Sequence, residues 1–192
     1  MRLVAELDAL KAELVAARAR VQELEVSADT DALVEVLNRR GFERELKRSL
    51  AYVKRYGIEA ALIYLDLDAF KPVNDRYGHA AGDAVLKAIG GVLVDNVRAS
   101  DVVARLGGDE FAVLLWHVPE SAAVAKAAAL EAAIAQAEVP WGQVVLGVGA
   151  SAGLAMLGRD DDPDALLARA DAAMYGRKAR RADAPEPHLR PQ

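Results

Sequence analysis

Two short apolar runs joined by a tight turn constrain the fold of this chain more than any other feature. Residues 101–105 and 111–116 are rich in Val, Leu and Phe, and residues 106–110, Leu-Gly-Gly-Asp-Glu, separate them. Paired glycines suit the turn of a β-hairpin, because glycine adopts positive φ angles without steric cost. The pattern therefore predicts an antiparallel strand pair, which must bury at least one face against other elements.

The segments around this hairpin alternate between helical and strand-like patterns. Their spacing predicts this order along the chain: helix 38–56, strand 60–65, loop 70–82, helix 84–97, hairpin 101–116, helix 120–137, strand or strand pair 144–156, and helix 163–177. We assign 70–82 to a loop because it collects proline, asparagine, aspartate and glycine. Helices alternating around a hairpin indicate an α/β (α+β) sandwich, in which helices cover an antiparallel sheet.

Composition excludes several classes of protein. Hydrophobic residues make up 53% of the 192 residues, which excludes wholesale disorder. The formal charge of -5 argues against a protein that binds nucleic acid through bulk positive charge. The absence of cysteine excludes a disulfide framework, Cys-ligated zinc and a thiol nucleophile. No apolar run approaches the roughly 20 residues of a membrane span, and the N-terminus lacks the apolar core of a signal peptide, so we expect a cytoplasmic chain without membrane contact.

The first 28 residues follow a coiled-coil pattern. Apolar residues recur in steps of four and three, at Leu3, Leu7, Leu10, Leu14, Ala17, Val21 and Leu24. A single helix cannot bury so narrow a stripe, so we predict a homodimer through this stalk; a helix folded back on its own domain is the alternative. Prolines concentrate after residue 181, which predicts a disordered tail. The chain therefore divides into a stalk at 1–28, a domain at 29–181 and a tail at 182–192.

Two acidic clusters follow strand-like segments. Residues 66–68, Asp-Leu-Asp, end the run at 60–65, and residues 109–110, Asp-Glu, lie at the hairpin tip. If the two strands are neighbours, these acids converge into an oxygen-rich site for a hard cation such as Mg²⁺. The glycines at 107–108 would let a phosphate approach the backbone closely. The pattern is typical of metal-dependent phosphoryl or nucleotidyl transfer, but acids and glycines are also ordinary turn residues, and spacing alone leaves both interpretations open.

Longer strings of residues decide between these interpretations. Residues 107–111 read GGDEF, and residues 66–83 resemble the pattern DxDxFKxxNDxxGHxxGD. Shorter matches are LNRR at 37–40, SAGLA at 151–155 and RADAAMY at 169–175. In this register the chain resembles the GGDEF-domain diguanylate cyclases from about Asp29 to Arg181.

The resemblance implies a fold and a reaction. The fold is that of the palm of nucleotide cyclases and polymerases, with a central, mostly antiparallel sheet surrounded by helices. The reaction condenses two GTP molecules into cyclic di-GMP and releases two pyrophosphates, with Mg²⁺ as the cofactor and Mn²⁺ as an alternative. One domain of this kind binds one GTP, so two copies must face each other, and the stalk would raise the effective concentration of one for the other.

The resemblance also assigns roles to individual residues. The implied catalytic residues are Asp109 and Glu110, and the implied metal ligands are Asp66, the Leu67 carbonyl, Asp109 and Glu110. Glu110 either binds metal or assists deprotonation of the 3′-hydroxyl. The implied substrate-binding residues are Phe70, Lys71, Asn74, His79, Asp83, Gly107, Gly108 and Lys178. Among these, Asn74 and Asp83 are expected to read the guanine edge, and Lys178 to meet the terminal phosphates.

Residues 98–101 read RASD, a short RxxD motif. Alone it indicates a surface ion pair, but in this register it resembles the family's product-inhibition site, where Arg98 grips cyclic di-GMP and Asp101 supports it. One departure from the family lies upstream. Residues 33–36 read LVEV where the family usually has Leu-Thr-Gly-Leu, so Glu35 replaces a glycine and we expect an altered path for that turn.

Two other functions stay open at this point. A catalytically idle GGDEF domain would act as a receptor for GTP or cyclic di-GMP. A pure dimerisation module would leave the acids without a purpose. The intact acids and guanine-reading residues favour the enzyme.

Overall fold

The structure, a computed structural model, describes residues 13–14, 20 and 28–182. The predicted stalk at 1–28 and the predicted tail at 182–192 fall almost entirely outside these residues. Within the described ranges, no helix combines the length and the apolar character that a membrane span requires.

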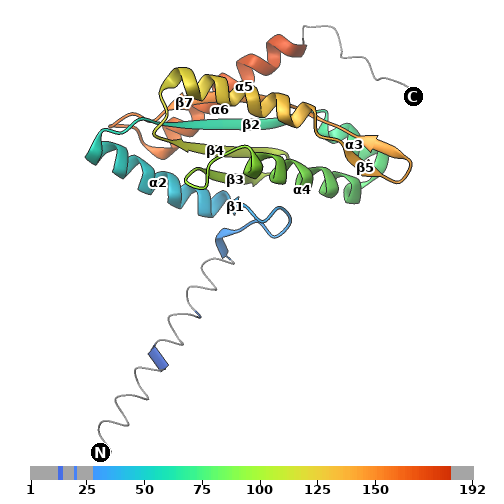
Figure 1. The fold of residues 1–192 in the computed structure, drawn as a ribbon, viewed down its shortest axis with the longest axis horizontal. Helices are drawn as coiled ribbons and strands as arrows, with labels where there is room; N and C mark the ends of the chain where they lie inside the picture. The colour runs from blue at the N-terminus through green and yellow to red at the C-terminus, as the bar shows by residue number, and fades with distance from the viewer. Residues whose placement is uncertain (1–12, 15–19, 21–27, 183–192) are drawn as a thin grey trace, which may run out of the picture.

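Short connections join the helices and strands of the domain (Figure 1). Their order is β1 (Leu37–Asn38), α2 (Arg39–Tyr56), β2 (Ala60–Asp68), α3 (Phe70–Tyr77), α4 (His79–Asp95), β3 (Val102–Gly107), β4 (Glu110–Trp116), α5 (Glu120–Ala135), β5 (Val139–Trp141), β6 (Val144–Leu146), β7 (Gly149–Met156) and α6 (Pro163–Ala182). Local signals set several boundaries. The Asn38 side chain accepts a hydrogen bond from the Gly41 amide at the start of α2, and Gly57 ends that helix in the left-handed conformation.

The sheet has five strands in the order β1-β3-β4-β2-β7. β1 runs parallel to β3, and the other neighbours are antiparallel. β5 and β6 form a separate antiparallel pair. The predicted hairpin is confirmed as β3 and β4, and the predicted fold of a mostly antiparallel sheet flanked by helices is confirmed.

Helices cover both faces of the sheet (Figure 1). Side chains of the central strand β2 alternate between two cores. Leu65 and Leu67 lie in the core that β2 shares with α4 and α5, whereas Leu62 and Tyr64 lie in the core that it shares with α2 and α6. This alternation places the side chains of residues 66 and 68 on the α2/α6 face, where β2 leaves the sheet.

The predicted loop at 70–82 is wrong. These residues form α3 and the first turn of α4, and only Gly78, at φ 84°, interrupts them. Pro72 is the third residue of α3, where a backbone N–H has no partner within the helix, so its missing donor costs nothing. The polar residues and glycines of 70–82 therefore did not prevent α3 and the start of α4 from forming. The sequence prediction also missed β1 and β5, and it ended the last helix five residues early.

Candidate functional site

The two acidic clusters lie side by side because β2 and β4 are neighbouring strands. In the antiparallel register Asp66 stands opposite Glu110 of β4, and on its other side opposite Ser151 of β7. Directly opposed residues project from the same face of a sheet, so these three side chains share the α2/α6 face. Ser151 donates its hydroxyl to both carboxylate oxygens of Asp68, each at 3.0 Å.

Lys178 of α6 brings a positive charge to these acids. Its Nζ donates a hydrogen bond to Asp66 and lies 3.9 Å from an oxygen of Asp68. Burial acts to lower the pKa of Lys178, but the hydrogen bond and charge of Asp66, with the charges of Asp68 and Asp109, outweigh burial and leave the pKa above its usual value. A single ammonium thus faces carboxylates from both acidic clusters.

Glu110 is held by groups other than Lys178. The hydroxyl of Tyr64, two residues before Asp66 on the same face of β2, donates a hydrogen bond to the Glu110 carboxylate. Burial and this hydrogen bond raise the pKa of Tyr64, so the hydroxyl stays a donor. Arg39 places its Nη2 3.6 Å from Glu110 Oε2. Arg39, the first residue of α2, and Tyr64, a buried residue of β2, therefore hold the Glu110 carboxylate in place.

The hairpin tip carries two glycines with positive φ angles, Gly107 at 151° and Gly108 at 49°. Neighbouring elements bind its carbonyls. The Leu67 amide donates to the Asp109 carbonyl at 3.1 Å, and Arg39 Nε donates to the Leu106 carbonyl at 2.8 Å. Both glycines are exposed, and a Cβ at either would meet nothing within 4 Å. The tip is therefore open to solvent on the side where side chains would project.

The predicted nucleotide-binding residues of 70–83 lie on α3 and α4, directly after β2. Phe70 is buried, and Asn74 packs so closely on Gly82 that a Cβ there would lie 2.0 Å from the Asn74 Oδ1 atom. This contact places Asn74 beside the residue that precedes Asp83. The side chains of Lys71, His79 and Asp83 are exposed.

Arg98 and Asp101 lie elsewhere, in a groove of about 510 Å³ between the end of α4 and the N-terminal turn, which we define as residues 29–36. Glu35 of that turn also lines the groove. Asp101 uses both carboxylate oxygens on backbone amides, accepting from Arg98 at 3.0 Å and from Trp116 at 3.1 Å. Glu35 adopts φ 61°, so the left-handed conformation falls on the residue that replaces the family's glycine.

The two acidic clusters together fit a divalent cation only in combination with further ligands. In the part of the chain that the structure describes, no three His, Cys, Asp or Glu side chains form a group able to hold a metal ion. Asp66 and Glu110 nevertheless supply two opposed carboxylates, and Asp66 already binds a cationic group, the Lys178 ammonium. Mg²⁺ is commonly held by one or two carboxylates together with water and substrate phosphates, and this donor set suits that kind of site.

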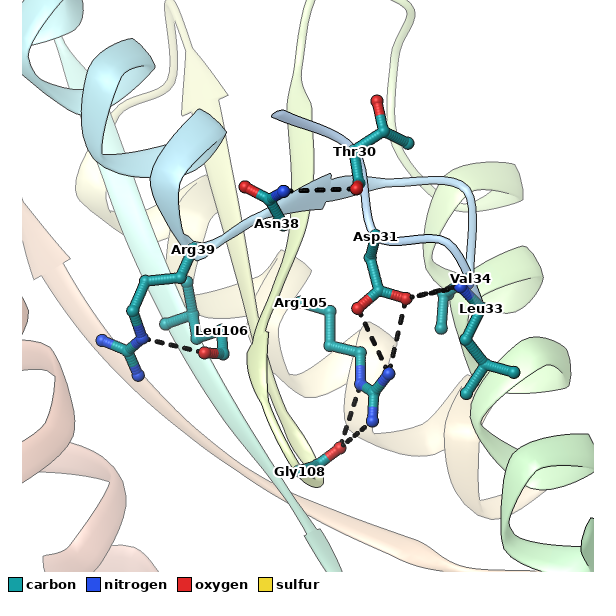
Figure 2. Close-up of polar contacts among 9 residues, drawn as sticks. All are labelled: Thr30, Asp31, Leu33, Val34, Asn38, Arg39, Arg105, Leu106 and Gly108. Carbon is teal, nitrogen blue, oxygen red and sulfur yellow. Dashed lines mark hydrogen bonds and ion pairs between the residues drawn. The ribbon is translucent and has the colours of Figure 1, made fainter. Parts of the chain in front are cut away.

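Sequence reasoning missed several groups that support the acids. Tyr64 could have been found, because a strand places residues 64 and 66 on one face. Arg39 and Ser151 stood inside the matched strings, but no pattern along the chain indicates that they meet Glu110 and Asp68. Asp31 was likewise given no role, although it binds Arg105 next to the hairpin tip (Figure 2).

Comparisons with known proteins agree with this geometry. Residues 28–184 match the family described as "Diguanylate cyclase, GGDEF domain". The chain is 39% identical over 176 residues to the diguanylate cyclase TpbB of Pseudomonas aeruginosa, which covers 88% of this chain and 40% of TpbB. It is 38% identical over 167 residues to the probable diguanylate cyclase DgcE of Escherichia coli (strain K12), and this match covers 86% of this chain and 15% of DgcE. It thus spans less than half the length of these curated relatives.

A solved structure is also similar over almost the whole chain. The coiled coil and GGDEF domain of DgcB from Caulobacter crescentus, in complex with c-di-GMP, superposes with a TM-score of 0.82 at 26% sequence identity. The match covers 95% of this chain and 96% of the DgcB chain.

Proposed function

This chain belongs to the GGDEF family of diguanylate cyclase domains, and from that premise we propose that it condenses two GTP molecules into cyclic di-GMP, releasing two pyrophosphates. The observation that carries the proposal is that Glu110 stands opposite Asp66, whose carboxylate binds Lys178, at the end of β2. Relatives at 38% and 39% identity are named for this activity. Since GTP is a nucleotide of the cytoplasm, we place the reaction there.

The chemistry is a nucleotidyl transfer carried out twice. The 3′-hydroxyl oxygen of one GTP bonds to the α-phosphorus of the other, the bond between the α- and β-phosphates breaks, and pyrophosphate leaves with its electron pair. A bound Mg²⁺, or Mn²⁺ in its place, would neutralise charge on the phosphates. Asp66, the Leu67 carbonyl, Asp109 and Glu110 would hold it. Lys178 would turn from Asp66 to the terminal phosphates when the cation arrives, since two positive charges compete for one carboxylate.

Glu110 is also suited to accept the proton of the 3′-hydroxyl. Tyr64 and Arg39 orient its carboxylate, so one oxygen can face a substrate without a search for the right rotamer. Asn74 and Asp83 would read the guanine edge, because a carboxylate accepts from the N1–H and amino donors that adenine lacks. Phe70, Lys71 and His79 would shape the pocket around the base, and Gly107 and Gly108 would let a phosphate approach the hairpin tip.

Each domain would supply one GTP, so the reaction needs two copies face to face. We assign the homodimer to the stalk at 1–28. Replacing Leu7, Leu10 and Leu14 with glutamine should lower activity far more at low protein concentration than at high, because association then limits the rate. Equal loss at every concentration would count against the stalk.

Cyclic di-GMP itself would bind at Arg98 and slow the enzyme, with Asp101 in support. This assignment predicts inhibition by added product in the wild type and weaker inhibition in Arg98→Ala.

The decisive experiment incubates the purified chain with GTP and measures cyclic di-GMP and pyrophosphate, with Mg²⁺, Mn²⁺ or Ca²⁺ in separate reactions. We expect one cyclic di-GMP for every two pyrophosphates. Nucleotide binding without product, even at high protein concentration, would instead support a receptor for GTP or cyclic di-GMP.

A further inference from the structure

Arg105 binds two segments that are far apart in the sequence. Its Nε and Nη2 donate to the Gly108 carbonyl at 3.0 and 2.8 Å, and its Nη1 lies 3.4 and 3.2 Å from the two carboxylate oxygens of Asp31 (Figure 2). Only 15% of the Arg105 side chain and 20% of the Asp31 side chain is exposed. One guanidinium therefore joins the N-terminal turn to the hairpin tip.

The tip has little conformational preference of its own. Gly107 and Gly108 follow one another, and glycine is the residue with the widest choice of backbone angles. The register between β3 and β4 also shifts between Arg105 and Gly107, so the regular pairing is interrupted just before the turn, and only the pair Gly107 and Glu110 follows the irregularity. Gly108 and Asp109 lie outside the paired residues, so a group that binds the peptide between them selects its orientation.

Arg105 supplies that selection. A trans peptide directs its C=O and its N–H to opposite sides, so holding the Gly108 carbonyl on Arg105 turns the Asp109 N–H away from it. The other peptide of Asp109 is held as well, because the Leu67 amide donates to the Asp109 carbonyl. Both peptide groups around the first acid of the tip are thus fixed from outside the turn.

Asp31 is a firm anchor for the guanidinium. Its Oδ1 accepts from the amides of Leu33 and Val34, each at 3.0 Å, and its own amide donates to the Val36 carbonyl at 2.8 Å. These bonds close the N-terminal turn around the carboxylate, so the carboxylate has few other positions available. Figure 2 shows Asp31 between this turn and Arg105.

We propose that Arg105 is a positioning residue, anchored by Asp31, that fixes the Gly108–Asp109 peptide so that its N–H binds the β- or γ-phosphate of the nucleotide. This inference rests on the proposed function, since it assigns the phosphates to the hairpin tip. The N-terminal turn thereby influences nucleotide affinity without contacting the nucleotide.

Arg169 offers a matched control within the same chain. It also bridges an aspartate and a backbone carbonyl, with Nη1 and Nη2 2.6 and 2.8 Å from the carboxylate of Asp161 and Nη2 2.8 Å from the Met156 carbonyl. Neither of its partners belongs to the hairpin tip. Arg169→Lys therefore breaks the same kind of clamp at a distance from the site.

The test measures binding of two probes to the full chain: the α,β-methylene analogue of GTP, which cannot release pyrophosphate, and GMP. Lysine cannot reach two partners with a planar fork, so Arg105→Lys should weaken binding of the triphosphate analogue by about tenfold, the loss expected for one charge-assisted contact. Binding of GMP and the melting temperature should change no more than in Arg169→Lys. Asp31→Asn should give a smaller loss in the same direction, and the double variant should lose less than the sum.

Equal weakening of both probes, or triphosphate binding as in the wild type, would overturn the inference. Production of cyclic di-GMP by the wild type is a separate measurement. A chain that shows the expected binding pattern without making product would keep the inference and lose the proposed function. A chain that makes product while Arg105→Lys binds normally would do the reverse.

Discussion

The acidic residues at the end of β2 and the groove that Arg98 and Asp101 line both include an aspartate beside a basic residue, yet the two aspartates are bound in different ways. Asp66 contacts the side chain of Lys178, a long flexible group that a ligand can displace. Both carboxylate oxygens of Asp101 instead accept hydrogen bonds from backbone amides, those of Arg98 and Trp116, which a ligand cannot displace without moving the backbone. A carboxylate bound by a side chain is available to a ligand, whereas one bound by backbone amides is part of the structure.

The two sites therefore divide their work differently. In the proposed function the acids at the end of β2 are the reactive groups, and the neighbouring strands and helices hold them in place. In the groove Asp101 holds backbone amides, and we propose that the Arg98 side chain contacts the ligand. Four pairs of substitutions break or sharpen this comparison, beginning with the pair of largest effect.

Asp66→Asn should lower the rate of cyclic di-GMP formation at least about 100-fold, because it removes a charged ligand of the proposed cation. The matched control is Asp68→Asn, which alters an acid on the same face of β2 that the Ser151 hydroxyl already engages. We expect a loss of less than about tenfold there. Steady-state rates at saturating Mg²⁺ and GTP measure both. Similar losses in the two variants would mean that position along β2 does not matter.

Lys178→Met should raise the KM for GTP by about tenfold and change kcat less, because an interaction with the terminal phosphates is made before and during the reaction. If Lys178 only neutralises Asp66, the same variant would instead leave KM unchanged and need less Mg²⁺ for half-maximal rate. Lys126→Met is the control, since that lysine binds the Asn96 carbonyl at 2.9 Å, away from the acids. Kinetics over a range of Mg²⁺ concentrations distinguish the two roles.

The sequence anticipated the elements whose chemistry is local and failed where distant residues decide. The hairpin and the strand at 60–65 were predicted because apolar runs and paired glycines specify them without outside help. The stretch at 70–82 was assigned to a loop because its polar residues are common in turns, but packing of Phe70 and Val73 into the core makes it helical.

The same division holds at the site. The acids of residues 66–68 and 109–110 were found from motifs, and their convergence followed from one assumption about neighbouring strands. Arg39, Ser151 and Asp31 reach the site or its hairpin across 67 or more residues of sequence, and no periodicity along the chain reports such contacts. Supporting residues of this kind are visible only once the sheet order is known.

Asp101→Ala should destabilise the fold by about 1–3 kcal/mol, because it leaves the amides of Arg98 and Trp116 without their acceptor. Arg98→Ala should change stability by less than about 0.5 kcal/mol, as is usual for an exposed side chain, and should weaken inhibition by cyclic di-GMP. Denaturant unfolding measures the first effect and product titration of the rate the second. A stable Asp101→Ala that only loses inhibition would contradict the structural role of this carboxylate.

Glu35→Gly should give the smallest effects and would sharpen the comparison most. A left-handed conformation costs a residue with a side chain roughly 1–2 kcal/mol, and the greater freedom of glycine in the unfolded chain cancels part of the gain, so we expect stabilisation of at most about 1 kcal/mol. For a domain of this size that is a rise in melting temperature of about 2–4 °C.

The substitution also removes a negative charge from the groove that Arg98 lines, so cyclic di-GMP should inhibit a few-fold more strongly at low salt. Glu35→Gln separates the two effects, because it removes the charge and keeps the strained conformation: inhibition should strengthen while the melting temperature stays unchanged. If Glu35→Gln leaves inhibition at the wild-type level, the groove does not bind its ligand through the charge of Arg98, and the contrast between the two sites rests on Asp101 alone.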